Sequence, residues 1–173
     1  MFRRILNAVI DSQERKLGQS LDYLRYMLRH SWGGFRQFTK IFSMSAYRKT
    51  LPIDACSVAR IVSTMCEDCG ACVQIGIDMA IRDGVPTPLI QAIIDDDFER
   101  LSPELCDVAR FSQCVARAQE PGDELRERIR HAYGDSGLVE ISLAIATSRF
   151  YPTMKRALGY AKTCSVLKPR IQS

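Results

Sequence analysis

Three cysteines stand three residues apart within residues 65–84, and they are the residues of this chain best suited to chemistry. Cys66, Cys69 and Cys72 form two overlapping C-x-x-C pairs. One thiol of such a pair often has a lowered pKa, and the pair can close a small disulfide. A thiolate can attack a peroxide and become a sulfenic acid, which a second thiol then resolves to a disulfide. A reductant returns both sulfurs to thiols by exchange.

The segment that must position these thiols is predicted to be a helix. Helical residues are about 100° apart, so Cys69 and Cys72 share one face, as a dithiol requires. Asp68 is a suitable N-cap, and Gly84 stands where a glycine commonly ends a helix. Cys69 would then lie in the first turn, where the helix dipole favours a thiolate.

Apolar residues recur at helical spacing along the rest of the chain, and no alternating strand pattern with hairpin turns is found. We therefore predict an all-α fold, a single-domain helical bundle. Its parts are predicted to be a basic amphipathic N-terminal helical extension (1–50), a main helical domain (51–167) and a loose tail (168–173). The 173 residues, 46% of them hydrophobic, suffice for one domain with a real core.

Local signals divide the main domain further. A clean apolar stripe predicts a helix over residues 53–65, directly ahead of the cysteines. Residues 134–137, with a glycine at each end, are expected to form a loop. Pro152 is expected to interrupt the helical pattern that follows.

Charge is distributed unevenly along the chain. Residues 1–50 carry ten basic and three acidic side chains, whereas the remainder carries fourteen and seventeen. The basic extension could contact an acidic partner, a second copy of the chain or anionic lipid, and a solvated helix face accounts for it equally well. No nucleic-acid motif accompanies the extension, so nucleic acid is not expected as a partner. No stretch has the length of a membrane span. An amphipathic basic helix more often packs on its own domain or a sister subunit than on a membrane, so membrane contact is not expected either.

Seven cysteines without a credible export signal indicate a reducing, cytoplasmic setting. There, clustered cysteines are more often catalytic or metal-binding than structural. A zinc site needs four ligands, and three thiols with no second C-x-x-C or histidine pair supply too few, so no metal is expected. No cofactor-binding motif is present. Four further thiols are expected to be inert core residues: Cys56, Cys106, Cys114 and Cys164.

The pattern Cys69-Gly-Ala-Cys72, followed by Ala80 and Gly84-Val85, resembles the signature of the carboxymuconolactone decarboxylase superfamily. This superfamily includes the alkyl hydroperoxidase D-like proteins. The resemblance implies a helical fold and a dithiol peroxidase or disulfide-exchange (antioxidant) activity. It also implies a hydroperoxide substrate, a dithiol or protein reductant, and a homo-oligomer. In the peroxidase members the cysteine matching Cys72 attacks and the one matching Cys69 resolves, whereas the dipole argument alone favours Cys69.

The chain departs from the signature at its proton relay. Gly76 stands where the family has a histidine, and Ser57 stands where it has a glutamate. The nearest replacements in the sequence are Glu67, Asp68, Asp54 and His131, and the sequence places none of them beside the sulfurs. Two hypotheses follow: an enzyme that uses Cys69 and Cys72, or a non-catalytic oligomeric scaffold that kept the fold and lost the relay.

Overall fold

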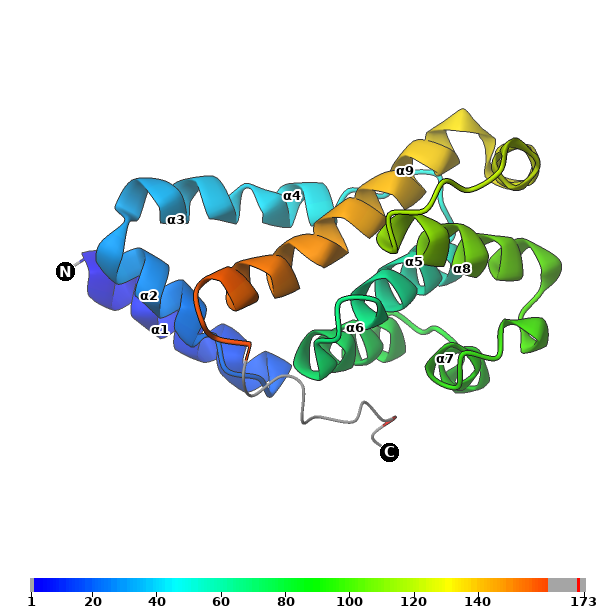
Figure 1. The fold of residues 1–173 in the computed structure, drawn as a ribbon. Coiled ribbons are helices and arrows are strands. Elements are labelled where there is room, and N and C mark those ends of the chain that lie inside the picture. Colours follow the sequence, from blue (N-terminus) through cyan, green and yellow to red (C-terminus); the bar gives the residue numbers. More distant parts are fainter. Residues whose placement is uncertain (1, 162–170, 172–173) are drawn as a thin grey trace.

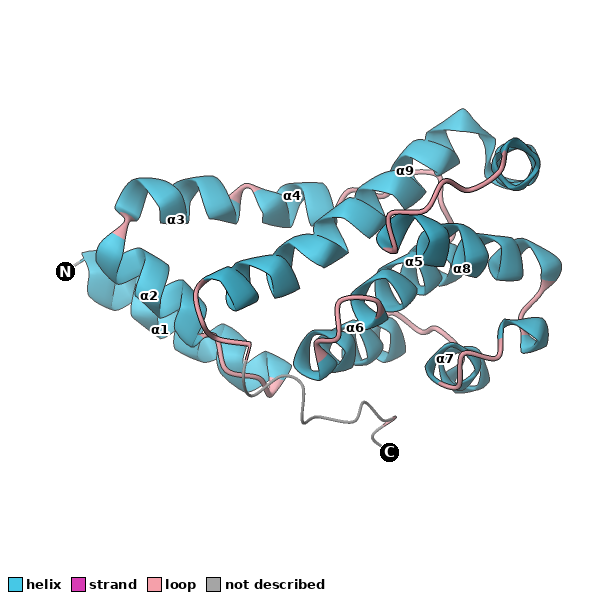
Figure 2. Ribbon diagram, in the orientation of Figure 1, coloured by secondary structure: helices cyan, strands magenta, loops and turns pink. Residues whose placement is uncertain are grey.

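A computed structural model describes residues 2–161 and residue 171, and helices are the only regular secondary structure among them (Figure 1, Figure 2). The predicted all-α, single-domain bundle is confirmed. Its elements are α1 (Phe2–Leu17), α2 (Asp22–His30), α3 (Trp32–Thr39), α4 (Ile41–Ser45), α5 (Ile53–Met65), α6 (Gly70–Arg82), α7 (Thr87–Ile94), the short 3₁₀ helix η1 (Phe98–Arg100), α8 (Pro103–Ala116) and α9 (Asp123–Ala157).

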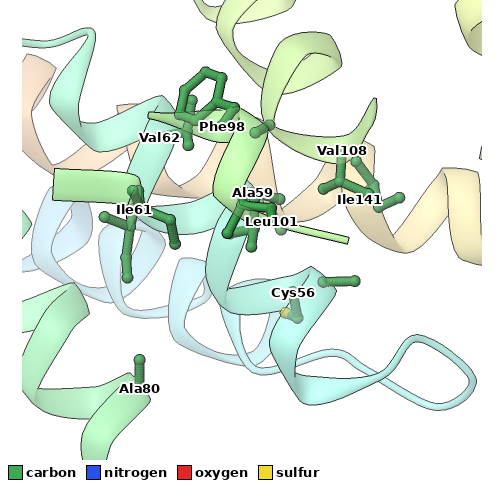
Figure 3. Close-up of a cluster of buried hydrophobic side chains, with 14 of the residues drawn as sticks. Cys56, Ala59, Ile61, Val62, Ala80, Phe98, Leu101, Val108 and Ile141 are labelled. Atoms are coloured by element: carbon green, nitrogen blue, oxygen red, sulfur yellow. The ribbon is translucent and has the colours of Figure 1, made fainter. Parts of the chain in front are cut away.

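Helix α5 lies at the centre of the first core, which α5, α6, α7, η1, α8 and the middle of α9 form together. The helix coincides with the predicted span 53–65. It packs against α6, α8 and α9, so it has no broad solvent-facing side. Ala55 and Ala59 are fully buried, and small side chains of this kind let neighbouring helices approach closely. Figure 3 shows Ala59 in this core with Val108 of α8 and Ile141 of α9.

A second core joins the N-terminal helices to the end of the chain. Its buried residues are Ile10, Leu21, Tyr23, Leu24, Met27, Leu28, Phe35 and Phe38. The carboxy-terminal half of α9 covers them with partly buried side chains, among them Phe150, Tyr151 and Met154. The basic extension is therefore packed on α9, the last helix of the described residues, and α9 belongs to both cores (Figure 1).

Helix α9 corrects two local predictions. Its geometry breaks at Gly134 (φ 69°, ψ 175°), within the predicted loop, but residues 135–137 are already helical. Pro152 lies inside the helix and does not interrupt it. A proline removes one helical hydrogen bond. Its neighbours Phe150 and Tyr151 pack in the second core, and this packing outweighs the local preference.

Part of the predicted C-terminal region lies outside the described residues. This applies to Cys164 and to the tail 168–173, except for Ile171, which packs against the first core. Within the described part of the chain, no helix has both the length and the apolar character needed to cross a membrane.

A buried glutamate fixes the linker between the two cores. Glu140 on α9 is 3% exposed and accepts hydrogen bonds from the backbone N–H groups of Lys49 (3.0 Å), Thr50 (3.1 Å) and Leu51 (3.0 Å). The Thr50 hydroxyl donates a further bond at 3.0 Å. Burial raises the pKa of the Glu140 carboxyl, but these hydrogen bonds lower it more, so the pKa lies below its ordinary value.

Replacing this glutamate by alanine is expected to lower the free energy of unfolding by about 1–3 kcal/mol, because the buried Leu51 amide and the part-buried Lys49 and Thr50 amides lose their acceptor. The contribution of Glu140 is present above the ordinary carboxyl pKa of 4.5 and is lost as pH falls through the lower pKa of the folded state. Urea unfolding at about pH 7 and about pH 3 measures both effects. The difference between wild type and Glu140→Ala should narrow in acid, and an equal difference at both pH values contradicts this assignment.

Candidate functional site

The three clustered cysteines lie at the turn that joins α5 to α6. Cys66 directly follows α5, and the backbone N–H of Asp68 donates to the carbonyl of Met65 at 3.2 Å. Asp68 adopts a left-handed conformation (φ 51°) that turns the chain. Cys69 (φ −123°, ψ 84°), and not Asp68 as predicted, is therefore the N-cap residue of α6. An N-cap requires an extended backbone, which the positive φ of Asp68 excludes.

Cys69 and Cys72 are brought together at the start of α6. Their Sγ atoms are 3.0 Å apart, and the two cysteines are in the reduced form, with no disulfide between them. The backbone N–H groups of Cys72 and Val73 donate to the Cys69 carbonyl at 2.9 and 3.0 Å, which fixes the turn between the two sulfurs. The predicted shared face is confirmed, and a small movement would let this dithiol close to a disulfide.

The two thiols differ in their access to solvent. Cys69 is 3% exposed, whereas Cys72 is only partly buried. Both lie at the amino-terminal end of a 13-residue helix, where the helix dipole stabilises a thiolate. The dipole therefore does not distinguish them, but access does. Cys72 is therefore the more solvent-accessible residue of the pair.

The third clustered cysteine has a separate environment. The Cys66 thiol is hydrogen-bonded to Arg117, the residue that follows α8. The positive charge of Arg149 on α9 also acts on it. Burial raises the pKa of Cys66, and the two guanidinium groups offset only part of this effect. Cys66 is therefore a protonated thiol at neutral pH, and the chemistry of this corner rests on the other pair.

An ion pair between a buried carboxylate and two partly exposed arginines attaches the same corner to α9. The Glu67 side chain is 7% exposed, and its Oε1 accepts a hydrogen bond from Arg149 Nε at 2.6 Å. Arg156 Nη2 donates to Glu67 Oε2 at 3.0 Å and to the Glu67 backbone carbonyl at 2.9 Å. Burial raises the pKa of Glu67, but the two arginines lower it more, so the net pKa lies below the ordinary value. Glu67 is therefore a bound anion, not an available base.

Sequence reasoning missed both arginines of this ion pair. Arg149 and Arg156 lie 82 and 89 residues beyond Glu67, and no local pattern connects positions so far apart. One signal was available in Glu67 itself. A carboxylate at the end of an apolar helix, between two cysteines, needs a counter-ion if the fold buries it.

Gly76 and Ser57, the two positions at which the sequence departs from the signature, lie on the facing helices α6 and α5. A Cβ atom at Gly76 would be 3.5 Å from Ile61 Cγ1, which places these residues opposite each other on α6 and α5. Cys72 is one turn from Gly76 towards the corner, and Ser57 is one turn from Ile61 away from it. The antiparallel hairpin thus separates Cys72 from Ser57 by about 12 Å along the helices. Ser57 is buried at that distance.

The other candidate proton acceptors also lack a suitable position. Asp54 is in the first turn of α5, at the end opposite the cysteine corner. His131 is exposed and precedes the Gly134 break in α9. Asp68 adjoins Cys69 in the chain, but its side chain is exposed to solvent.

The remaining cysteines lie elsewhere in the bundle. Cys56 and Cys106 are buried, and burial raises the pKa of each, as expected for inert core thiols. Cys114 is partly buried on α8. Among the residues that the structure describes, no group of three or more histidine, cysteine or acidic side chains is arranged to hold a metal ion.

The chemistry of the cysteine corner has to be inferred from its own residues. No protein-family model matches this chain. No curated protein and no solved structure matches it either.

Proposed function

We propose that the Cys69/Cys72 dithiol makes this chain a thiol-dependent peroxidase or disulfide-exchange protein, of the alkyl hydroperoxidase D-like type in the carboxymuconolactone decarboxylase superfamily. The observation that carries the proposal is the 3.0 Å contact between two reduced sulfurs at the start of α6. Its partners are a hydroperoxide substrate and a dithiol or protein reductant in a reducing, cytoplasmic setting. A homo-oligomer formed through the N-terminal helices is part of the same proposal.

The greater exposure of Cys72 assigns it the first step. Its thiolate attacks the terminal oxygen of the hydroperoxide, the O–O bond breaks, and the alcohol leaves after taking a proton. Cys72 is then a sulfenic acid. The Cys69 thiol displaces its hydroxyl as water and forms the disulfide. Two thiols of the reductant restore both cysteines by exchange and become a disulfide themselves.

Proton transfer is the slow part of this cycle. Gly76 and Ser57 offer no group to take the thiol proton or to protonate the leaving alkoxide, so water performs both tasks. General acid–base catalysis typically contributes about 10²–10⁴-fold. We therefore expect turnover to be slower, by a factor of that order, than in an enzyme with a complete relay.

The second candidate function is a non-catalytic oligomeric scaffold. The observation that favours it is the same absence of a relay: Gly76 faces Ile61, and Ser57 lies buried two turns away from Cys72. On this hypothesis the dithiol is an inherited feature without a role. The scaffold predicts a thiol pair that does not respond to peroxide.

An assay of the purified full chain separates the two candidates. Cumene hydroperoxide is supplied with dithiothreitol, peroxide consumption is followed, and mass spectrometry after peroxide alone detects a Cys69–Cys72 disulfide. The peroxidase proposal expects catalytic consumption and this single disulfide. Unchanged thiols after peroxide treatment would support the scaffold instead. Disulfide formation without peroxide consumption above the dithiothreitol blank would restrict the function to disulfide exchange.

A further inference from the structure

The ion pair beside the dithiol supports an inference that rests on the proposed function and deepens it. We propose that Glu67, held by Arg149 and Arg156, is a positioning residue that keeps Cys69 and Cys72 in the geometry from which a disulfide forms. Glu67 stands two residues before Cys69, inside the turn itself. The two arginines that bind Glu67 therefore also hold the backbone that leads into α6.

The hydrogen bonds reach both the side chain and the main chain of the turn. Arg156 Nη2 donates to Glu67 Oε2 and also to the Glu67 backbone carbonyl, at 3.0 and 2.9 Å. Arg149 Nε donates to the other carboxylate oxygen of Glu67, Oε1. The next residue, Asp68, adopts a left-handed conformation that is uncommon for a residue with a side chain. Contacts from α9 are thus available to hold this less favourable backbone in place.

The two arginines act from a rigid support. Arg149 and Arg156 are seven residues apart on α9, so two helical turns bring them to the same face. Phe150, Tyr151 and Met154 point away from that face and pack in the second core. The position of the dithiol is therefore set by a helix that the N-terminal helices hold from its other side.

Loss of this ion pair should make the Cys69–Cys72 disulfide less stable. A disulfide within one helical turn is favoured because the two sulfurs are already neighbours, and a loose turn reduces that advantage. In glutathione buffers, Glu67→Ala is expected to lower the equilibrium constant for closing the disulfide at least tenfold. A tenfold change corresponds to about 30 mV in the reduction potential.

A second variant separates positioning from charge. Glu67→Ala removes a negative charge beside the thiols, whereas Arg156→Ala removes a positive one. An electrostatic effect would move the potential in opposite directions, but loss of positioning moves it in the same direction for both. Arg156 is 56% exposed, so its variant is expected to fold even if Glu67→Ala does not. Glu140→Ala is the matched control, because it removes a buried carboxylate that is bonded to residues 49–51, at the end of α5 opposite the cysteines.

The experiment is a glutathione redox titration of the full chain, with the Cys69–Cys72 disulfide read by mass spectrometry. The expected result is a higher potential for Glu67→Ala and Arg156→Ala and an unchanged one for Glu140→Ala. Shifts of opposite sign, no shift in Arg156→Ala, or an equal shift in Glu140→Ala would overturn the inference. Because this readout needs no peroxide, it stays informative if the chain proves not to be a peroxidase, in which case only the proposed function fails.

Discussion

Serine in place of Cys72 is expected to abolish peroxide turnover, because the attacking sulfur is lost and Cys69 is too buried to replace it. Serine in place of Cys69 should also abolish turnover, but at a later step. Cys72 can then react once and remain a sulfenic acid that no thiol resolves. Steady-state peroxide consumption measures the loss in both variants. Mass spectrometry of Cys69→Ser after peroxide should show one added oxygen atom.

Two other cysteines provide matched controls for this pair. Cys66→Ser and Cys56→Ser should retain wild-type turnover, because Cys66 lies against Arg117 and Cys56 is sealed in the first core. Circular dichroism checks that each variant folds. The role assigned to the dithiol is wrong if Cys69→Ser and Cys72→Ser keep wild-type turnover, or if Cys66→Ser loses it.

Histidine in place of Gly76 is expected to increase peroxide turnover, by a factor on the order of 10² if general acid–base help is the missing element. Gly76 is one helical turn from Cys72, so an imidazole there lies within reach of its thiol. Space is available, since a Cβ atom at this position makes only an ordinary contact with Ile61 at 3.5 Å. The increase in turnover should depend on pH, with a midpoint near the ordinary histidine pKa of about 6.5. A pH–rate profile measures this dependence.

Alanine at the same position isolates the contribution of the imidazole. Gly76→Ala should stabilise α6 by about 0.8–1 kcal/mol, because alanine is the better helix former, and should leave turnover unchanged. A rate increase in Gly76→Ala would show that helix stability, and not proton transfer, limits the reaction. No increase in Gly76→His would mean that the imidazole cannot reach the reacting atoms.

The parts of the fold that depend on short-range signals could be predicted from the sequence. The span of α5 follows from its apolar stripe. The end of α6 follows from Gly84, whose φ of 86° permits the closing bonds from Gly84 N–H to the Ile81 carbonyl and from Val85 N–H to the Ala80 carbonyl, at 3.1 and 3.0 Å. The proximity of Cys69 and Cys72 follows from their spacing of three residues at the start of α6, although Cys69 is the N-cap and not a residue of the first turn.

Contacts between distant segments could not be predicted in this way. The N-cap of α6 is Cys69 and not Asp68, because Asp68 has a left-handed backbone conformation in the turn after α5. No local sequence pattern indicates that conformation. The arginine partners of Glu67 depend on how α9 crosses the corner. Pro152 stays helical for a similar reason, because tertiary packing of its neighbours decides its conformation. In each case contacts between segments that are distant in the sequence determine the conformation.

The sharing of α9 between two cores has a consequence during synthesis. The N-terminal helices bear Phe35 and Phe38, whose partners on α9 begin at Phe150, more than a hundred residues later. At the usual elongation rate of about 5–20 residues per second, the ribosome needs roughly 6–22 s to make the intervening segment. During that interval the nascent chain carries uncovered aromatic side chains, which are binding sites for chaperones and hazards for aggregation. The second core is thus completed only after the carboxy-terminal half of α9 has been synthesised.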